Sequence, residues 1–401
     1  MKTAAIIAEY NPLHNGHIYH LDQTRTQSGA DYVVVIMSGN FVQRGEPACA
    51  DKMTRAEWAL KAGADIVLEL PSIYSVGNAE RFALGAIRTL ESTGVIDFLS
   101  FGCEEPDLRI LYSLADLLAS PSDAFINCMH ANLEKGLSFP RAQSEALRAI
   151  GIDPKMTESL SNPNNILAVE YLKALRLNRS GIRPLAIMRN DDGYHSESIG
   201  SFYSSASAIR NAFRKKEIEA ALPSMPSYVG GTFMFNEGYP IFPEDFSSML
   251  MYALRKMTAG QIREIPDVGE GIENLIIKEA IRCRSISELF DAVKSKRYTM
   301  ARIKRIVLCA ALGISMDHIR ASMHGSDGLY LRVLGFRSES EQLLSEIARK
   351  RTAPLILKKE DERECSDIVR SNLAIDSLST DLMRYATGID IRRDHTAPIV
   401  I

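Results

Sequence analysis

Short, uninterrupted runs of apolar residues recur through the first half of this 401-residue chain, and they constrain its fold more than any other feature. A run without polar alternation is typical of a strand that is buried on both faces, as in a parallel sheet covered by helices. Helical stretches at residues 53–62 and 79–93 separate the runs. Strands that alternate with helices in this way predict an α/β fold with a Rossmann-like, doubly wound parallel sheet. The expected strands span residues 4–8, 31–37, 64–71, 96–102 and 183–188.

The second half of the chain has helical periodicity in place of such runs. Apolar residues in the segment 246–257 recur at the spacing of one helix face. Ser285 and Thr299 stand where they can cap two further helices, and Gly313 where the second of these can end. Proline and glycine cluster at residues 222–231, which indicates a linker. We therefore expect an α/β domain at residues 1–222 and an all-α domain at residues 223–401, in keeping with about 150 residues per domain.

Composition narrows the class of protein further. Hydrophobic residues make up 46% and charged residues 24%, which favours packed cores over disorder. No apolar run reaches the roughly 18 residues of a membrane-spanning helix, and the short apolar start does not fit a signal peptide. The six cysteines form no C-x-x-C pair, which fits reduced thiols better than a zinc cluster or disulfides. We expect a cytoplasmic protein with no membrane partner.

A polar motif, Glu-Tyr-Asn-Pro-Leu-His-Asn-Gly-His, follows the first expected strand at residues 9–17 and precedes a helical stretch. In open α/β sheets ligands bind beyond the carboxyl ends of the strands, where the next helix offers free N–H groups. Gly16 leaves room for a nucleotide to approach the backbone. His14 and His17 can donate hydrogen bonds to phosphate oxygens as charge builds on the α-phosphorus. The motif predicts a nucleotide site with His14 and His17 as catalytic residues.

Two other roles stay open for these histidines at this point. The first is that of surface or helix-capping residues without a ligand. The second is a metal site, because His14, His17 and His20 recur at every third residue. On a helix, however, His20 would lie about 240° round from His14, off the shared face. No carboxylate stands at a fitting offset either, so we expect no metal site.

The motif at the end of the first strand resembles the signature of the H-x-G-H nucleotidyltransferase superfamily, which is related to class I aminoacyl-tRNA synthetases. Residues 204–210, Ser-Ser-Ala-Ser-Ala-Ile-Arg, resemble the second motif of that superfamily, I-S-S-T-x-I-R. The resemblance implies that Ser207 and Arg210 hold the β- and γ-phosphates of ATP. Ala206 departs from the commonest spelling, which leaves part of these contacts to backbone N–H groups. Residues 51–55 look faintly like the synthetase lysine loop, but they follow the first motif too soon, and we expect a helix start there.

Further blocks of the chain resemble one family in this superfamily, the bacterial tRNA(Met) cytidine acetate ligases. The resemblance covers most of the chain, because the blocks occur in order at residues 38–48, 68–71, 101–102, 163–167 and 296–299. It implies that ATP is bound by the end of the first strand, the motif and the start of the next helix, and by five residues further along. These residues are Ile7, Ala8, Glu9, Tyr10, Asn11, Pro12, Leu13, His14, Asn15, Gly16, His17, Ile18, Tyr19, His20, Gly102, Asn164, Arg189, Ser207 and Arg210.

The same resemblance implies a reaction in two steps. Acetate attacks the α-phosphorus of ATP, pyrophosphate leaves, and acetyl-adenylate forms. The exocyclic amine of the wobble cytidine in elongator tRNA(Met) then attacks the acyl carbon, and AMP leaves. Gly102 would leave room for the adenosine, Asn164 would hydrogen-bond the nucleotide, and Arg189 would contact its ribose or phosphates. Mg²⁺ is expected to accompany ATP without a dedicated metal site in the protein.

Two alternatives to this function remain. A small-molecule nucleotidyltransferase would transfer the adenylyl group to a phosphorylated metabolite. Such enzymes are typically short single domains, so the helical half of this chain would have no function under that alternative. A nucleotide-sensing RNA-binding protein would perform no chemistry, and the intact motifs speak against it. The sequence does not address the oligomeric state.

RNA binding requires a local basic surface, because the net charge of −3 gives no overall attraction to nucleic acid. Residues 294–305, here called the basic segment, contain six basic residues and no acidic one. Within the segment, Tyr298 could stack on a base. Arg44, in the loop after the second strand, could contact acetate or an RNA phosphate. The basic residues of the segment are Lys294, Lys296, Arg297, Arg302, Lys304 and Arg305, and residues 349–351 and 358–359 could extend the surface.

Overall fold

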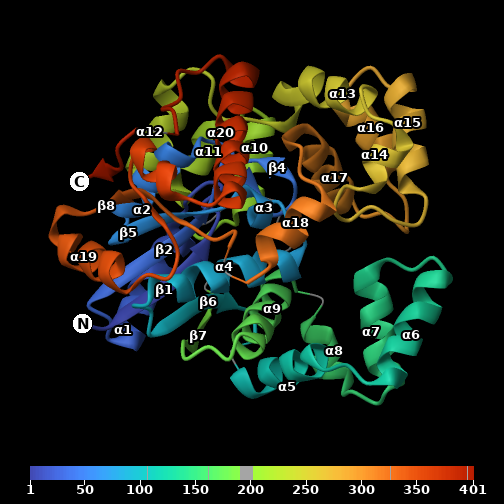
Figure 1. The fold of residues 1–401 in the computed structure, drawn as a ribbon, viewed down its shortest axis with the longest axis horizontal. Coiled ribbons are helices and arrows are strands. Elements are labelled where there is room, and N and C mark those ends of the chain that lie inside the picture. Colours follow the sequence, from blue (N-terminus) through green and yellow to red (C-terminus); the bar gives the residue numbers. More distant parts are fainter. Residues whose placement is uncertain (106, 161, 190–201, 326, 395) are drawn as a thin grey trace.

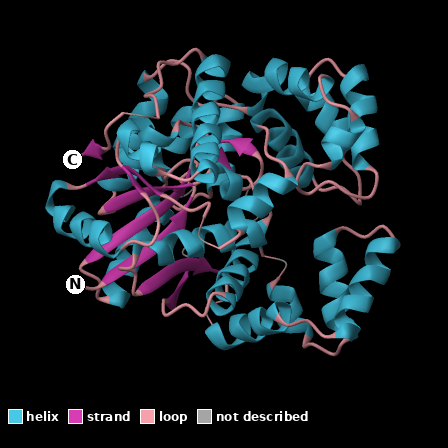
Figure 2. Cartoon of the chain, viewed as in Figure 1, coloured by secondary structure: helices cyan, strands magenta, loops and turns pink. Residues whose placement is uncertain are grey.

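A computed structural model describes residues 1–105, 107–160, 162–189, 202–325, 327–394 and 396–401. Its centre is a sheet of eight strands in the order β10-β8-β5-β2-β1-β6-β7, with β9 paired to β8 (Figures 1 and 2). Strands β5, β2, β1, β6 and β7 are parallel to their neighbours, whereas β8 is antiparallel to β5. The parallel strands are β1 (Thr3–Ala8), β2 (Tyr32–Ser38), β5 (Ile66–Leu70), β6 (Phe98–Cys103) and β7 (Arg183–Met188).

These five strands are those that the apolar runs predict, and the Rossmann-like α/β fold is confirmed. β2 lies on one side of β1 and β6 on the other, so the direction of winding reverses at β1. The carboxyl ends of β1 and β6 therefore form the switch point at which such folds bind ligands. The H-x-G-H motif directly follows β1 and stands at this point.

Helices cover both faces of the sheet because successive strand residues face opposite ways. Val34 and Ile36 of β2 belong to the core that includes α4 (Ala79–Thr93) and α9 (Pro163–Leu177). Val33 and Val35 pack on the opposite side, with α1 and α2. The helices of that second face are α1 (Asn15–Ser28), α2 (Lys52–Lys61), α10 (Ala206–Arg214) and α12 (Ser227–Phe235).

A group of helices between β6 and α9 forms what we call the helical arm, which extends away from the sheet in Figure 1. Within it, α6 and α7 pack against each other as a hairpin. The arm consists of α5 (Leu108–Ala119), α6 (Asp123–Glu134), α7 (Phe139–Ala149) and α8 (Pro154–Ser159).

Within the expected all-α segment, residues 223–323 form helices and turns without a strand. α13 (Ser247–Arg255) buries the predicted apolar face, Ser285 caps α16 by accepting a hydrogen bond from the Glu288 amide at 3.2 Å, and Gly313 ends α17. The expected linker at residues 222–231 is wrong, because a 3₁₀ turn, η1 (Leu222–Ser224), and α12 form there and pack into the core. The other helices are α11 (Ile218–Ala221), η2 (Pro243–Phe246), α14 (Ala259–Arg263), α15 (Ile272–Arg282), α16 (Ile286–Val293), α17 (Met300–Leu312) and α18 (Met316–Met323). None of the described helices is by itself long and apolar enough to cross a membrane, and only the bent pair α17 and α18, which meet at 84°, passes that test jointly, by length and composition.

The C-terminal part of the chain returns to the sheet, which corrects the expectation of an all-α segment up to residue 401. β8 (Leu331–Phe336) pairs with β5, and β9 (Leu355–Ile356) and β10 (Ile399–Val400) pair with β8. The run of β8 contains Arg332 and Gly335, and these two residues hide its strand pattern. The division of the chain at residue 222 stays a prediction. The remaining elements are α3 (Ser72–Ser75), η3 (Ser338–Ser340), α19 (Glu341–Lys350), η4 (Lys359–Glu364), α20 (Asp367–Thr387) and the hairpin β3 (Phe41–Val42) with β4 (Glu46–Pro47).

Candidate active site

Both motif histidines cap the start of α1. His14 is the N-cap residue, and its Nδ1 accepts a hydrogen bond from the Gly16 amide at 3.1 Å. His17 Nδ1 in turn accepts one from the His14 amide at 3.2 Å. Because both Nδ1 atoms act as acceptors, each neutral ring carries its proton on Nε2. Each imidazole therefore keeps one N–H donor, on Nε2, that the cap does not use.

The two rings lie against each other; His14 is buried and His17 is half-buried. Their centroids are 3.8 Å apart in a stacked arrangement, and Tyr10 meets the His17 ring edge-on at 5.0 Å. Burial, with Arg189 and Arg210 nearby, lowers the pKa of His14 to about 3. Burial and His14 lower the pKa of His17 well below its ordinary value. Both rings are thus neutral hydrogen-bond donors at neutral pH, and any positive charge at the site comes from arginine.

Gly16 has a more local reason to be glycine than the approach of a nucleotide. A Cβ atom at this position would lie 3.0 Å from Cε1 of His14. The missing side chain lets the His14 ring fold back over the first turn of α1 and accept the Gly16 amide hydrogen bond. This geometry combines capping, one of the alternatives for the histidines, with a free Nε2 donor, so the two roles are compatible.

His20 has a different environment from the other two histidines. Its Nε2 lies 3.0 Å from Ser100 Oγ on β6, and Ser100 also contacts Thr24 Oγ1 at 2.6 Å. Burial lowers the pKa of His20 to about 4. Within the residues that the structure describes, no group of three or more His, Cys, Asp or Glu side chains could hold a metal ion. The contacts of His20 therefore tie α1 to β6.

A buried arginine supports the loops that surround the motif. Arg55 on α2 is 0% exposed, and it donates hydrogen bonds to the carbonyls of Glu9 at 2.6 Å and Ser38 at 3.1 Å, as well as to Gly39 and Ala50. It thereby clamps the carboxyl ends of β1 and β2 together. Sequence reasoning missed Arg55 because it treated residues 51–55 only as a helix start, which is confirmed at Lys52. The position of Arg55 three and four residues before the apolar Trp58 and Ala59, on one helix face, is the signal that could have found it.

The predicted residues from β6, α9 and β7 gather on the other side of the switch point. The Arg189 amide donates to Cys103 O at 3.2 Å, and a Cβ at Gly102 would lie 3.3 Å from Cγ of Arg189. Asn164 Nδ2 donates to Glu104 Oε1 at 2.6 Å. Glu104 belongs to no predicted motif, and its carboxylate orients Asn164. The structure thus places Gly102, Asn164 and Arg189 at the same sheet edge as the H-x-G-H motif.

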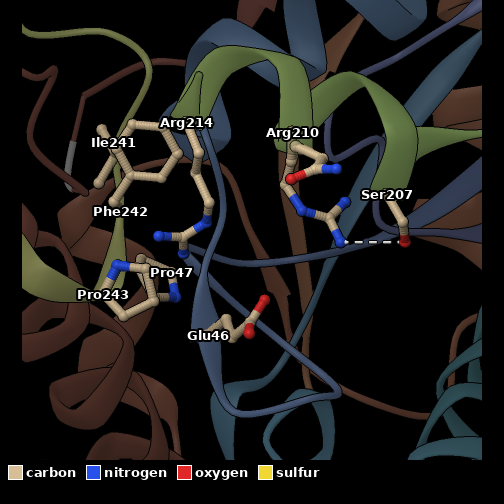
Figure 3. Close-up of a pocket in the computed structure, with 9 residues that line it drawn as sticks. Glu46, Pro47, Ser207, Arg210, Arg214, Ile241, Phe242 and Pro243 are labelled. Atoms are coloured by element: carbon tan, nitrogen blue, oxygen red, sulfur yellow. Dashed lines mark hydrogen bonds between the residues drawn. The ribbon is translucent and has the colours of Figure 1, made fainter. Parts of the chain in front are cut away.

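The second motif reaches the first through Arg210. Arg210 Nη1 donates to Asn11 O at 2.5 Å, and Arg210 Nη2 lies 3.5 Å from Ser207 Oγ. Figure 3 shows both side chains beside a pocket of about 210 Å³ that also receives Glu46 and Arg214. Pocket residues from three other positions complete the lining: Pro47, Asn211 and the segment Ile241–Pro243.

The pocket contains charged side chains of both signs. The guanidinium of Arg214 lies 4.8 Å from the Phe242 ring centre, and its Nη1 is 3.2 Å from Glu244 Oε2. Burial would raise the pKa of Glu46, but Lys304, followed by Arg210 and Arg214, holds the pKa of this carboxyl below its ordinary value. The pocket therefore presents two guanidinium groups and one carboxylate.

The structure changes the prediction for the basic segment. Three of its cations are neutralised by acids from elsewhere in the chain: Arg302 pairs with Glu270 at 3.1 Å, Arg305 with Asp267 at 2.6 Å, and Lys304 with Glu46. The absence of acids within the segment gave no hint of these partners.

Tyr298 is likewise engaged within the protein. Its side chain is only 8% exposed, and its hydroxyl donates to Glu270 O at 2.7 Å, so its ring is not available to stack on a base in this structure. Lys294 and Lys296 are exposed, as is Arg44 near the tip of the β3–β4 hairpin. The roles proposed for Lys296, Arg297 and Arg44 toward RNA or acetate remain predictions.

An H-x-G-H loop at the switch point of a parallel sheet, with a serine–arginine motif against it, defines a nucleotidyltransferase. The family model "HIGH Nucleotidyl Transferase" matches residues 1–395. A protein of Acetivibrio thermocellus named tRNA(Met) cytidine acetate ligase is 38% identical over 391 residues, or 95% of this chain and 94% of the relative. One of the same name from Caldanaerobacter subterraneus is 42% identical over 361 residues, or 89% of each chain. This chain belongs to that family of ligases.

Solved structures agree with this assignment. The crystal structure of Thermotoga maritima TmcAL bound with alpha-thio ATP aligns with the whole of both chains at a TM-score of 0.91 and 32% identity. The apo structure of the same protein aligns over the same extent at a TM-score of 0.93 and 32% identity.

Proposed function

We propose that this chain is an ATP-dependent ligase that acetylates the wobble cytidine of elongator tRNA(Met), giving N4-acetylcytidine. An acetate oxygen attacks the α-phosphorus of ATP, the bond to the bridging oxygen breaks, and pyrophosphate leaves. The N4 amine of the cytidine then attacks the carbonyl carbon of acetyl-adenylate, loses a proton, and expels AMP. Because the substrate is a tRNA, a cytoplasmic location is part of the proposal.

The observation that carries the first step is the pair of Nε2–H donors that the helix cap leaves unused, beside two arginines. Charge that develops on the α-phosphate is best stabilised by donors that are already oriented. The cap holds both imidazoles in one tautomer, and Arg189 and Arg210 lie close enough to lower the pKa of His14. His14 and His17 would therefore donate hydrogen bonds, while the arginines would supply the positive charge.

The positions of the residues at this edge of the sheet suggest which part of ATP each would hold. Ser207 and Arg210 would hold the β- and γ-phosphates, next to the pocket of Figure 3. Gly102, Asn164 and Arg189 would surround the nucleoside side. Mg²⁺ would arrive with the phosphates. The support for ATP is this arrangement together with the ATP analogue named for the Thermotoga structure.

Acetate and the tRNA enter the proposal through the relatives' names. The relatives match nearly the whole chain, including its helical half. This match favours the ligase over a small-molecule nucleotidyltransferase, which would need no helical half. The match also favours the ligase over a nucleotide-sensing RNA-binding protein that performs no chemistry.

Isotope exchange between pyrophosphate and ATP tests the first step. We expect exchange to require acetate, because only the attacking carboxylate releases pyrophosphate. Exchange that runs equally well without acetate would contradict the ligase. Mass analysis of tRNA after incubation with ATP and labelled acetate tests the second step, and label on a tRNA other than tRNA(Met) would contradict the proposed acceptor.

A further inference from the structure

Two groups of helices are attached to opposite sides of the nucleotide site. The helical arm, α5–α8, leaves the sheet after β6 and returns at α9, and the hydrogen bond between Asn164 Nδ2 and Glu104 Oε1, 2.6 Å long, joins its two ends. The second group, α13–α17, is attached through the β3–β4 hairpin, where Lys304 pairs with Glu46 of the pocket. Gly45 fits against the backbone of α17 so closely that a Cβ would come within 2.4 Å of the Arg305 amide nitrogen.

The free ends of these two groups meet. Gly136, in the turn between α6 and α7, has a positive φ of 82°, and a Cβ there would lie 3.4 Å from Nη2 of Arg297. Figure 1 shows the tip of the α6–α7 hairpin facing the α13–α17 helices. The turn at residues 133–141 and the loop at residues 294–297 therefore form one surface, which we call the tip surface.

Exposed cations collect on the tip surface. Lys135 and Arg141 come from the arm, and Lys294 and Lys296 from the loop before α17. In the part of the chain that the structure describes, no ion pair involves any of these four side chains, in contrast to the paired residues of α17. Glu134 is the acid on the same turn. The surface thus keeps a net positive charge, although the whole chain is acidic overall.

The turn of the tip surface also contains an exposed aromatic residue. Phe139, the first residue of α7, is 59% exposed, and it lies two positions from Arg141 in sequence. An exposed aromatic ring next to lysine and arginine is the combination that binds single-stranded nucleic acid, because cations contact phosphates while the ring stacks on a base. Phe139 can therefore do what the buried Tyr298 cannot.

We propose that the tip surface binds the tRNA substrate, with Lys135, Arg141, Lys294 and Lys296 on backbone phosphates and Phe139 on an unpaired base. The inference rests on the proposed function for the identity of the RNA. Charge complementarity favours RNA, which carries one negative charge per phosphate, over a second copy of this chain. With a net charge of −3, that copy offers no comparable density of negative charge. Both groups of helices are attached beside the nucleotide site, so a long RNA held at their free ends can span the distance to the site of acetyl transfer.

Two charge-reversal variants test the proposal on the full chain: Lys135→Glu with Arg141→Glu, and Lys294→Glu with Lys296→Glu. Lys61→Glu is the matched control, because this lysine lies on α2, away from both groups of helices. We expect each double variant to weaken binding of tRNA(Met) transcript by about tenfold or more and to reduce the slope of log K against log salt by roughly 1.5. Phe139→Ala should weaken binding by about tenfold through lost stacking. The control should bind like the wild type.

Acetate-dependent pyrophosphate exchange separates this inference from the proposed function, because that half-reaction needs no RNA. If the double variants bind tRNA with wild-type affinity, the tip surface is not the RNA site, whatever the exchange assay gives. If wild-type protein shows no acetate-dependent exchange, the proposed function fails, while the binding data still judge the surface.

Sedimentation tests the other possible partner of the tip surface, a second copy of this chain. A change of oligomeric state without a change of tRNA affinity would identify the tip surface as a contact between copies and overturn the proposal. Should a reversal variant lose exchange as well, the milder changes Lys135→Gln with Arg141→Gln repeat the same comparison.

Discussion

The chemistry of single residues at this site depends on which imidazole nitrogen carries the proton. Two backbone amides determine this, because the Gly16 and His14 N–H groups donate to Nδ1 of His14 and His17. A buried, neutral imidazole with its proton on Nε2 resembles an amide donor more than a cation. In the proposed function the motif would therefore provide directed hydrogen bonds at the α-phosphate, and Arg189 and Arg210 would provide the charge.

Substitution of His14 separates capping from phosphate binding. Asparagine is a good N-cap residue, whereas alanine is not. We expect His14→Ala and His14→Asn both to slow acetate-dependent pyrophosphate exchange by about 10²–10³, the usual effect of losing one transition-state donor. Only the alanine variant should also lose about 1 kcal/mol of stability in urea unfolding. Wild-type exchange in the alanine variant, which has no side-chain donor, would mean that His14 serves the cap alone.

The low pKa values of the three histidines predict a loss of stability in mild acid. Their unfolded pKa is about 6.5, whereas the folded pKa is about 3 for His14 and about 4 for His20. Below pH 6.5 the unfolded chain binds protons at these histidines that the folded chain does not bind. The free energy of unfolding therefore falls as pH falls.

The slope is about 1.4 kcal/mol per pH unit for each histidine once pH is well below its unfolded pKa. We expect urea midpoints measured from pH 7 to pH 5 to decrease, and to decrease less in His20→Gln, where the amide can still bond Ser100. An equal pH dependence in wild type and variant would show that His20 is not buried as a neutral ring.

Sequence reasoning found the motif residues because each motif is contiguous and has a recognisable place at a strand end or a helix start. It could not find the partners of the basic segment. Asp267 and Glu270 lie in an irregular segment before α15, and Glu46 lies on a hairpin from the other end of the chain. Which cations remain free for RNA is decided by such long-range pairs, and these are visible only in the folded chain.

Among the elements, α10 carries four polar side chains to the pocket: Ser207, Arg210, Asn211 and Arg214, at spacings that keep them on one side of the helix. Only the first two belong to the recognised motif. A leaving pyrophosphate carries several charges, and Arg214 is the cation that can meet its far end.

We expect Arg214→Gln to raise the KM for pyrophosphate in the exchange reaction about tenfold, the effect of one charge-assisted hydrogen bond. The KM for acetate should not change. Lys215→Gln, which removes the same charge from the next residue without touching the pocket, is the control. A higher KM for acetate instead would assign the pocket to the carboxylate and not to the phosphates.

The elements that the sequence predicts and those it does not differ in how local their stabilisation is. β1, β2 and β5 are recognisable because each contains an uninterrupted run of at least three apolar residues. β8 is not, because Arg332 and Gly335 interrupt its apolar run, and Gly335 approaches Leu60 and Ile399 so closely that a side chain would not fit. The charge of Arg332 is tolerated in the sheet only through Glu69 and Asp394, which lie far from it in sequence.

On the scale of the whole molecule, the C-terminal segment supports the loops that form the nucleotide site. Lys52 at the start of α2 lies 2.7 Å from both Glu69 Oε1 and Asp394 Oδ1, and these three side chains are at most 1% exposed. A Cβ at Gly39, in the loop after β2, would come 2.6 Å from Glu69 Oε1. The Gly39 carbonyl in the same loop accepts a hydrogen bond from Arg55. The last residues of the chain are therefore coupled to the loops that follow β1 and β2.

Asp394→Asn tests this coupling. The substitution keeps the shape of the side chain but leaves Lys52 and Arg332, both buried, with one carboxylate between them, and removing one partner from a buried ion pair typically costs about 3–5 kcal/mol. We expect a correspondingly lower urea midpoint and, in the variant that remains folded, a weaker affinity for ATP, because the loops around the motif lose their support. Asp390→Asn is the control, since that carboxylate is 99% exposed and lies 3.7 Å from Arg384; it should unfold like the wild type. If Asp394→Asn unfolds at the same urea concentration as Asp390→Asn, the buried charges do not hold the C-terminal segment to the sheet, and the ATP site must be stabilised by Arg55 and the core alone.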